Sequence, residues 1–171
     1  RLLNSASESI AKRAKLIFSK NFFMNRNEVF LKFSTSLKLN GKADEGKAIY
    51  EALCSQCHAE ETQLGPDLRS ITDRSGEGLL NSIINPSQQV DPKYLAYNAV
   101  FNDGRIIVGI IASESGDSLK MIVPGIGLQS INRNELKSLK SLDLSLMPIG
   151  LEASLTNQKM ANLLEFLKNH K

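Results

Sequence analysis

The segment Cys54-Ser55-Gln56-Cys57-His58 limits what this chain can be more than any other part of its sequence. Two cysteines three positions apart can each form a thioether with one vinyl group of the same haem, and a histidine directly after them can bind the iron. The sequence therefore predicts one covalently attached haem c per chain, with Cys54 and Cys57 as its anchors and His58 as an axial ligand.

Three other uses of a Cys-x-x-Cys pair stay open as alternatives. A thioredoxin-like redox pair needs a βαβ context, whereas residues 44–53 have a helical pattern. A structural zinc site needs four ligands, and the chain has two cysteines and two histidines, one of which, His170, is next to last. A simple disulfide would leave His58 without a role. Haem explains all three side chains at once.

Composition and charge are those of an ordinary soluble globular protein. Apolar residues make up 42% of the 171 residues and charged residues 23%, and the net charge of +3 gives no reason to expect a nucleic-acid partner. No apolar run approaches the roughly 20 residues of a membrane span. The sequence starts at Arg1 without a signal peptide, yet haem c is attached outside the cytoplasm. We therefore expect a periplasmic or otherwise extracytoplasmic location, and a fragment of a longer secreted protein.

The pattern of apolar residues predicts a mainly α fold. Residues 1–39 read as a helical extension, with Asn25 capping a helix whose aromatic residues either cover the haem domain or end an upstream helical domain. Residues 40–171 read as the haem domain. In its first helix, Gly46 indicates the close approach of another helix. Thr156 caps the last helix.

A β-rich insertion is predicted within the haem domain, at residues 96–139. Asn102-Asp103-Gly104 joins two β-rich runs and is a strong hairpin signal. Further strands are expected at 118–123 and 128–131, which gives a small antiparallel sheet of three to four strands. Residues 132–139 are expected to form a short helix or turn.

The turn Gly65-Pro66-Asp67-Leu68 follows the cysteine segment. The carbonyl of Pro66 could accept a hydrogen bond from Nδ1 of His58, which would leave Nε2 for iron. A plain turn with no such contact is the alternative.

A second axial ligand would distinguish an electron carrier from a gas-binding protein or peroxidase. The candidates are Met24, Met121, Met147, Met160 and His170. Met160 lies on the apolar face of the last helix, Met121 alternates with apolar residues of a strand, Met24 precedes the haem segment and His170 lies at the terminus. Met147 remains: it sits in the loop Ser145-Leu146-Met147-Pro148 with no apolar pattern to explain it.

From about Asn25 to its end, the chain resembles the planctomycete and verrucomicrobial type of haem-binding domain, which is similar to class I cytochrome c with an insertion. The shared landmarks are Gly41, Gly46-Lys47-Ala48-Ile49-Tyr50, the cysteine segment, Gly65-Pro66-Asp67-Leu68, Ile84-Asn85-Pro86-Ser87, Asp91-Pro92-Lys93-Tyr94, Asp103-Gly104-Arg105 with Gly109, and Ser145-Leu146-Met147-Pro148 with Gly150-Leu151. One departure is the glycine-poor stretch 59–64.

This resemblance implies a cytochrome c-like helical haem domain and a role for each matching residue. Cys54 and Cys57 would be the thioether anchors, His58 and Met147 the iron ligands, and Pro66 the carbonyl partner of His58. Arg74 is a further candidate, as a partner of a haem propionate or as a solvated surface arginine.

Two functions are compatible with these residues. The first is one-electron transfer by a non-enzymatic c-type cytochrome module, serving a redox partner protein or a fused dehydrogenase domain. The second is a haem peroxidase or a gas or redox sensor in which the bond to Met147 is labile. A partner- or carbohydrate-binding role for the β-rich insertion ranks below both.

Overall fold

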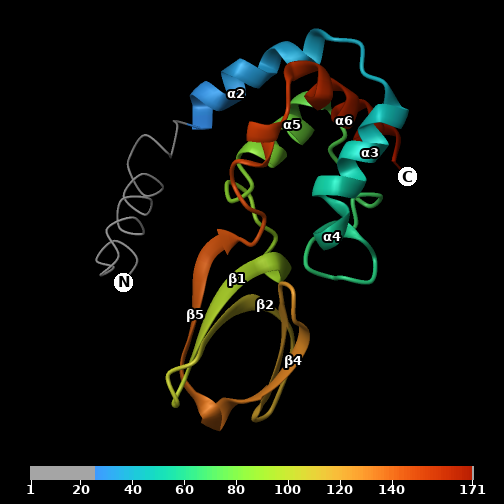
Figure 1. Ribbon diagram of the computed structural model, residues 1–171. Coiled ribbons are helices and arrows are strands. Elements are labelled where there is room, and N and C mark those ends of the chain that lie inside the picture. Colours follow the sequence, from blue (N-terminus) through green and yellow to red (C-terminus); the bar gives the residue numbers. More distant parts are fainter. Residues whose placement is uncertain (1–25, 171) are drawn as a thin grey trace, which may run out of the picture.

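The computed structural model describes residues 26–170, in which helices and strands form separate parts of the molecule (Figure 1). The α-helices are α2 (Arg26–Ser34), α3 (Ala43–Leu53), α4 (Ser55–His58), α5 (Gly76–Ile84) and α6 (Asn157–Asn169). The strands are β1 (Leu95–Phe101), β2 (Ile106–Ser115), β3 (Ser118–Val123), β4 (Gly127–Asn132) and β5 (Leu136–Ser145). Short 3-10 helices are η2 (Thr35–Lys38), η3 (Pro92–Tyr94), η4 (Arg133–Glu135) and η5 (Leu151–Ser154).

Helices α3 and α6 cross at Gly46, where the sequence indicates a close approach. A Cβ atom on Gly46 would overlap the backbone carbonyl of Asn162 in α6 and would lie 2.8 Å from Cβ of Phe166. The buried Asn162 side chain joins the two helices: its amide oxygen accepts from the Lys42 backbone N–H (3.0 Å), and its amide nitrogen donates to Glu45 (2.7 Å). The first turn of α3 is thus capped by a residue of α6.

Replacing Gly46 with alanine is expected to destabilise the fold by about 2 kcal/mol, because overpacking against a backbone carbonyl outweighs the better helix propensity of alanine. Urea unfolding would measure this change. Gly76→Ala in α5 is the matched control, since its new Cβ would meet only the ends of the Leu37 and Lys168 side chains, at 3.1 and 3.4 Å. Equal unfolding midpoints for the two variants would contradict the tight crossing.

One apolar core joins α2, α5 and α6. Its buried members are Val29, Phe33, Leu79, Leu80, Ile83, Ile84, Met160, Leu163, Leu164 and Leu167. Val29 and Phe33 show that residues 26–34 pack onto α5 and α6. The expectations for residues 1–25, including Asn25 as a helix cap, lie outside the described residues. At the other end, Thr156 caps α6 as predicted, because its hydroxyl accepts from the Lys159 N–H.

The five strands form one antiparallel sheet in the order β4-β3-β2-β1-β5. Asn102-Asp103-Gly104 connects β1 to β2, and Gly104 has the positive φ (90°) that this turn requires. The curved sheet (Figure 1) encloses a second apolar core, made of Ala99, Phe101, Leu119, Met121, Val123 and Ile131. The sheet therefore does not depend on the helices alone for its stability.

The prediction of a mainly α fold is wrong. Of the described residues, 41% are helical and 27% lie in strands, and the sheet has five strands rather than three to four. The missing strand is β5, most of which lies beyond the expected insertion, while only residues 133–135 of the expected helix or turn at 132–139 are helical.

A β-bulge explains why the pattern concealed β5. In its register with β1, Phe101 is opposite Leu136 but Val100 is opposite Ser138, so that Lys137 is skipped. Leu136 and Leu139 consequently both pack against the sheet core although they are three positions apart. A three-residue spacing of leucines resembles a helix rather than a strand.

None of the helices in residues 26–170 is both long and apolar enough to span a membrane.

Candidate functional site

The cysteine segment forms a helical turn directly after α3. The backbone N–H groups of Cys57 and His58 both donate to the carbonyl of Cys54, at 3.1 and 3.0 Å, and Cys54 itself donates to the carbonyl of Tyr50 (2.8 Å). Both cysteines are free thiols; Cys57 is exposed and Cys54 is half-buried. Residues three apart lie on the same side of a helix, so the two sulfur atoms can reach one planar group.

His58 is held in one orientation by the turn that follows. Its Nδ1 lies 2.8 Å from the carbonyl oxygen of Pro66, which can only accept, so Nδ1 carries the proton and Nε2 keeps its lone pair. Burial lowers the pKa of His58, and the Pro66 carbonyl opposes this shift. A Cβ on Gly65 would lie 2.8 Å from Cε1 of the imidazole, so the ring needs a glycine beside it. The neutral ring has the form that binds a metal.

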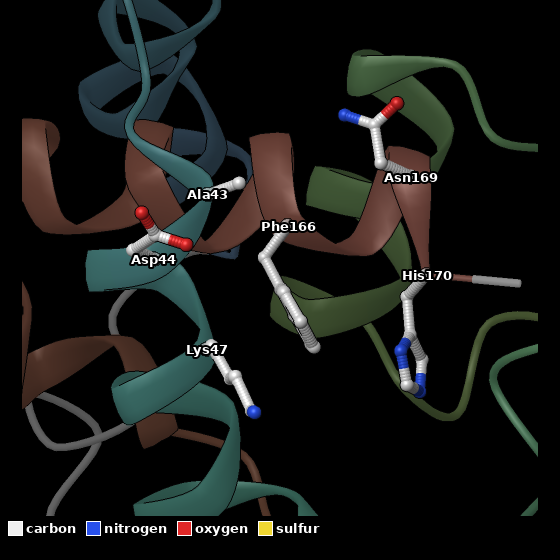
Figure 2. Close-up of a pocket in the computed structure, with 6 residues that line it drawn as sticks. All are labelled: Ala43, Asp44, Lys47, Phe166, Asn169 and His170. Carbon is white, nitrogen blue, oxygen red and sulfur yellow. The ribbon is translucent and has the colours of Figure 1, made fainter.

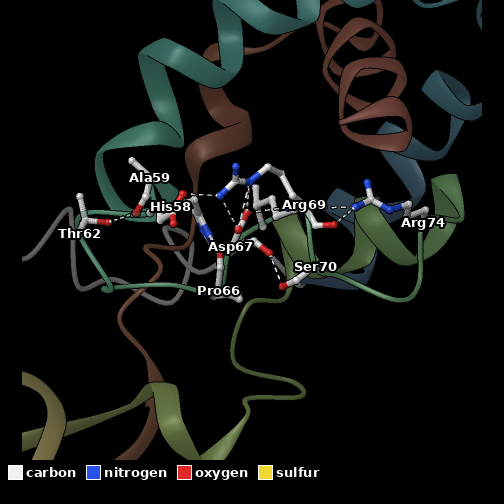
Figure 3. Close-up of polar contacts among 10 residues, drawn as sticks. His58, Ala59, Thr62, Pro66, Asp67, Arg69, Ser70 and Arg74 are labelled. Atoms are coloured by element: carbon white, nitrogen blue, oxygen red, sulfur yellow. Dashed lines mark hydrogen bonds and ion pairs between the residues drawn. The ribbon is translucent and has the colours of Figure 1, made fainter. Parts of the chain in front are cut away.

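Two arginines hold the loop that carries Pro66 (Figure 3). Arg69 bridges Asp67 and Glu60, with N–O distances of 2.8 and 2.7 Å, and its hydrogen bonds lower the pKa of Asp67. Arg74 donates to the carbonyls of Leu68 (3.1 Å), Arg69 (2.7 Å) and Leu167 (2.7 Å), the last of which lies in α6. Sequence reasoning missed the role of Arg69, although its position two residues after Asp67 was a signal. Among the described residues, Arg74 has no carboxylate partner. It is not a free surface side chain either, because its guanidinium group is hydrogen-bonded to these three carbonyls.

Met147 lies in the loop between β5 and η5. Its side chain is half-buried and packs against the helical core, as do Cys54, Leu68 and Ile71. Its backbone N–H donates to the hydroxyl of Ser145 (3.0 Å). The structure therefore brings Met147 and Cys54 to the same core, although they are far apart in sequence.

Three of the other ligand candidates pack against neighbouring side chains in the described part of the chain. Met160 and Met121 are fully buried, in the helical core and the sheet core. His170 packs against Tyr50 and Phe166, with ring centroids 5.2 and 4.8 Å apart. Met24 lies outside the described residues.

His170 and Phe166 also line a shallow pocket of about 290 Å³ at the α3–α6 crossing (Figure 2). The pocket is completed by Ala43, Asp44, Lys47 and Asn169. It contains neither cysteine nor His58, so it is separate from the candidate site.

The two thiols are expected to differ in reactivity in the haem-free protein. Burial raises the pKa of Cys54 to about 11, so at pH 8 only about one Cys54 in a thousand is a thiolate. Iodoacetamide should therefore alkylate Cys57 at least about tenfold faster than Cys54. Mass spectrometry of the Cys54→Ser and Cys57→Ser variants would measure both rates, with urea-unfolded samples, in which the rates converge, as the control. Equal rates in the folded variants would contradict the burial of Cys54.

Residues 41–95 match the family model described as Cytochrome C oxidase, cbb3-type, subunit III. This match supports a cytochrome c-like haem-binding domain in the chain and a c-type cytochrome electron carrier as its function. The matched segment contains Cys54, Cys57, His58 and Pro66, and it ends at Leu95, where β1 begins. Met147 lies outside it. No curated protein matches the chain.

Proposed function

We propose that this chain is a one-electron carrier with a single haem c, bound through Cys54 and Cys57 and ligated by His58 and Met147. The observation that carries the proposal is the hydrogen bond from His58 to Pro66 (2.8 Å), because it leaves the lone pair on Nε2 of a neutral imidazole, in a residue that directly follows two thiols on one helical turn. Both thiols and the ring thus have the form that covalent haem requires.

Each thiol would add across one vinyl C=C bond, with sulfur bonding to one carbon and hydrogen to the other, so attachment needs no external oxidant. The haem then supplies an iron centre that gains and loses one electron. Among the residues of the chain, Pro66 would hold the proton on Nδ1, which raises the basicity of His58 as a ligand. The guanidinium group of Arg74 is hydrogen-bonded to three backbone carbonyls. We therefore propose that Arg74 holds the loop that carries Pro66 in place, rather than pairing with a haem propionate.

Met147 would complete the coordination of the iron. Its half-buried position on the core that also contacts Cys54 supports this role. A thioether favours ferrous iron and raises the reduction potential, which suits electron transfer without substrate chemistry. The competing function is that of a peroxidase or sensor, which the exposure of the adjacent Pro148 and Ile149 favours because it eases opening of the loop.

The landmarks beyond residue 95 support the narrower resemblance to the planctomycete and verrucomicrobial type. We accordingly propose an extracytoplasmic location, where haem c is attached, and an electron donor that is a partner protein or a fused dehydrogenase domain.

A redox titration with CO addition tests this function on the haem-loaded chain. An electron carrier should give a one-electron Nernst curve, a six-coordinate low-spin spectrum in both states, and little reaction of the reduced form with CO. Rapid CO binding or a five-coordinate ferric spectrum would support the sensor or peroxidase instead. A chain that acquires no covalent haem when expressed with a haem c attachment system would overturn the proposal.

A further inference from the structure

The loop that carries Met147 starts directly from the sheet. Strand β5 ends at Ser145, two residues before Met147, and Ser145 is paired with Leu95, the first residue of β1. A register shift separates this pair from the regular part of the ladder, and the pair itself marks the position at which the chain leaves the sheet.

Two serine hydroxyls continue this connection. The hydroxyl of Ser145 accepts from the Met147 backbone N–H (3.0 Å), and the hydroxyl of Ser87 accepts from the Ser145 backbone N–H (3.1 Å). Both hydrogen bonds are partly buried. Ser87 follows the buried Pro86, just after the end of α5, whose apolar residues belong to the helical core. The two bonds link the Met147 backbone to the sheet and to the helices.

Beyond Met147 the loop is open to solvent. Pro148, Ile149 and Gly150 are exposed, whereas Leu146 and Met147 are half-buried. The backbone of Met147 is therefore restrained from the side of Ser145, and a partly buried hydrogen bond of this kind changes a conformational equilibrium by about twofold to tenfold.

We propose that Ser145 is a positioning residue for Met147, through which the inserted sheet keeps the methionine sulfur on the iron. The inference rests on the proposed function, because it takes Met147 as the distal ligand. It adds a role for the sheet that the His/Met pair alone does not imply: the sheet sets how readily that ligand leaves.

The test uses the haem-loaded chain and its Ser145→Ala variant. Under saturating CO, the rate at which the reduced protein binds CO is limited by departure of Met147, and we expect Ser145→Ala to raise this rate about twofold to tenfold. The pH at which the near-infrared sulfur-to-iron band disappears should fall by the logarithm of the same factor, about 0.3 to 1 pH unit.

Three variants complete the design. Ser145→Thr keeps the hydroxyl acceptor and should restore the wild-type rate. Ser138→Ala, near the start of β5 and opposite Val100, should leave the rate unchanged. Ser87→Ala removes the second hydrogen bond and should accelerate CO binding while it leaves Ser145 intact; it carries the test should Ser145→Ala not fold.

The outcomes separate the two claims. A band that persists in Met147→Ala would overturn the ligation and, with it, this inference. A band lost in Met147→Ala together with equal CO rates for Ser145→Ala and Ser138→Ala would overturn the inference alone. Unfolding midpoints measured beside the rates would expose a merely structural effect, which would move the midpoints and not the rates.

Discussion

Replacing Cys54 and Cys57 together with alanine is expected to abolish covalent haem attachment completely. The thioethers are the only covalent bonds proposed between the chain and the cofactor, and both thiols lie on the helical turn that precedes His58. Extraction with acidified acetone, followed by a haem stain of the denatured chain, measures what remains attached. Haem that stays with the extracted double variant would refute the anchoring role of the two cysteines.

The single variants provide the internal control for this result. Cys54→Ala and Cys57→Ala each keep one thiol, so each should retain haem through one thioether and leave one vinyl group free. The pyridine haemochrome spectrum of both should shift toward that of a haem with one unsaturated substituent. A single variant that behaves like the double variant would show that one cysteine carries the attachment alone.

Met147→Ala is expected to remove the near-infrared sulfur-to-iron band. It should also lower the reduction potential by an amount on the order of 100 mV, because the variant lacks the thioether that favours the ferrous state. Potentiometric titration followed by absorbance measures both quantities. The reduced variant should also bind CO without the delay caused by a departing ligand.

Met160→Leu is the matched control for Met147→Ala. Met160 is fully buried in the helical core, and a swap of similar volume costs less than about 1.5 kcal/mol. Its band and potential should match those of the wild type. If instead Met160→Leu lost the band and Met147→Ala kept it, the distal ligand would come from α6.

The half of the site around His58 could be predicted because it is local. Cys54 and Pro66 are twelve positions apart in the sequence, and a helical turn followed by Gly65-Pro66 leaves few conformations for the chain between them. The fit of the imidazole against Gly65 and the bridge from Arg69 to Asp67 and Glu60 were harder to foresee, because both depend on how the intervening loop folds.

The other half of the candidate site, which we propose at Met147, depends on tertiary structure. Between His58 and Met147 the chain forms a whole sheet, and no periodicity of the sequence indicates where the chain returns from β5 to the helices. The bulge beside Val100 hid that strand by placing Leu136 and Leu139 on the same face. The error in fold class has the same cause, since a sheet of three to four strands would have left the helices dominant.

The pairing of Leu95 with Ser145 also determines what kind of insertion the sheet is. Paired strand residues have Cα atoms about 5 Å apart, so the chain leaves the helical part and returns to it across a gap that two or three residues could span. For the helical part of the molecule, the insertion is therefore geometrically equivalent to a short connection. Strands could lengthen, and hairpins at their far ends could change in sequence or size, without moving the two points of attachment. The sheet can thus diverge while the two points at which it joins the helical part, and with them the proposed cofactor site, stay in place.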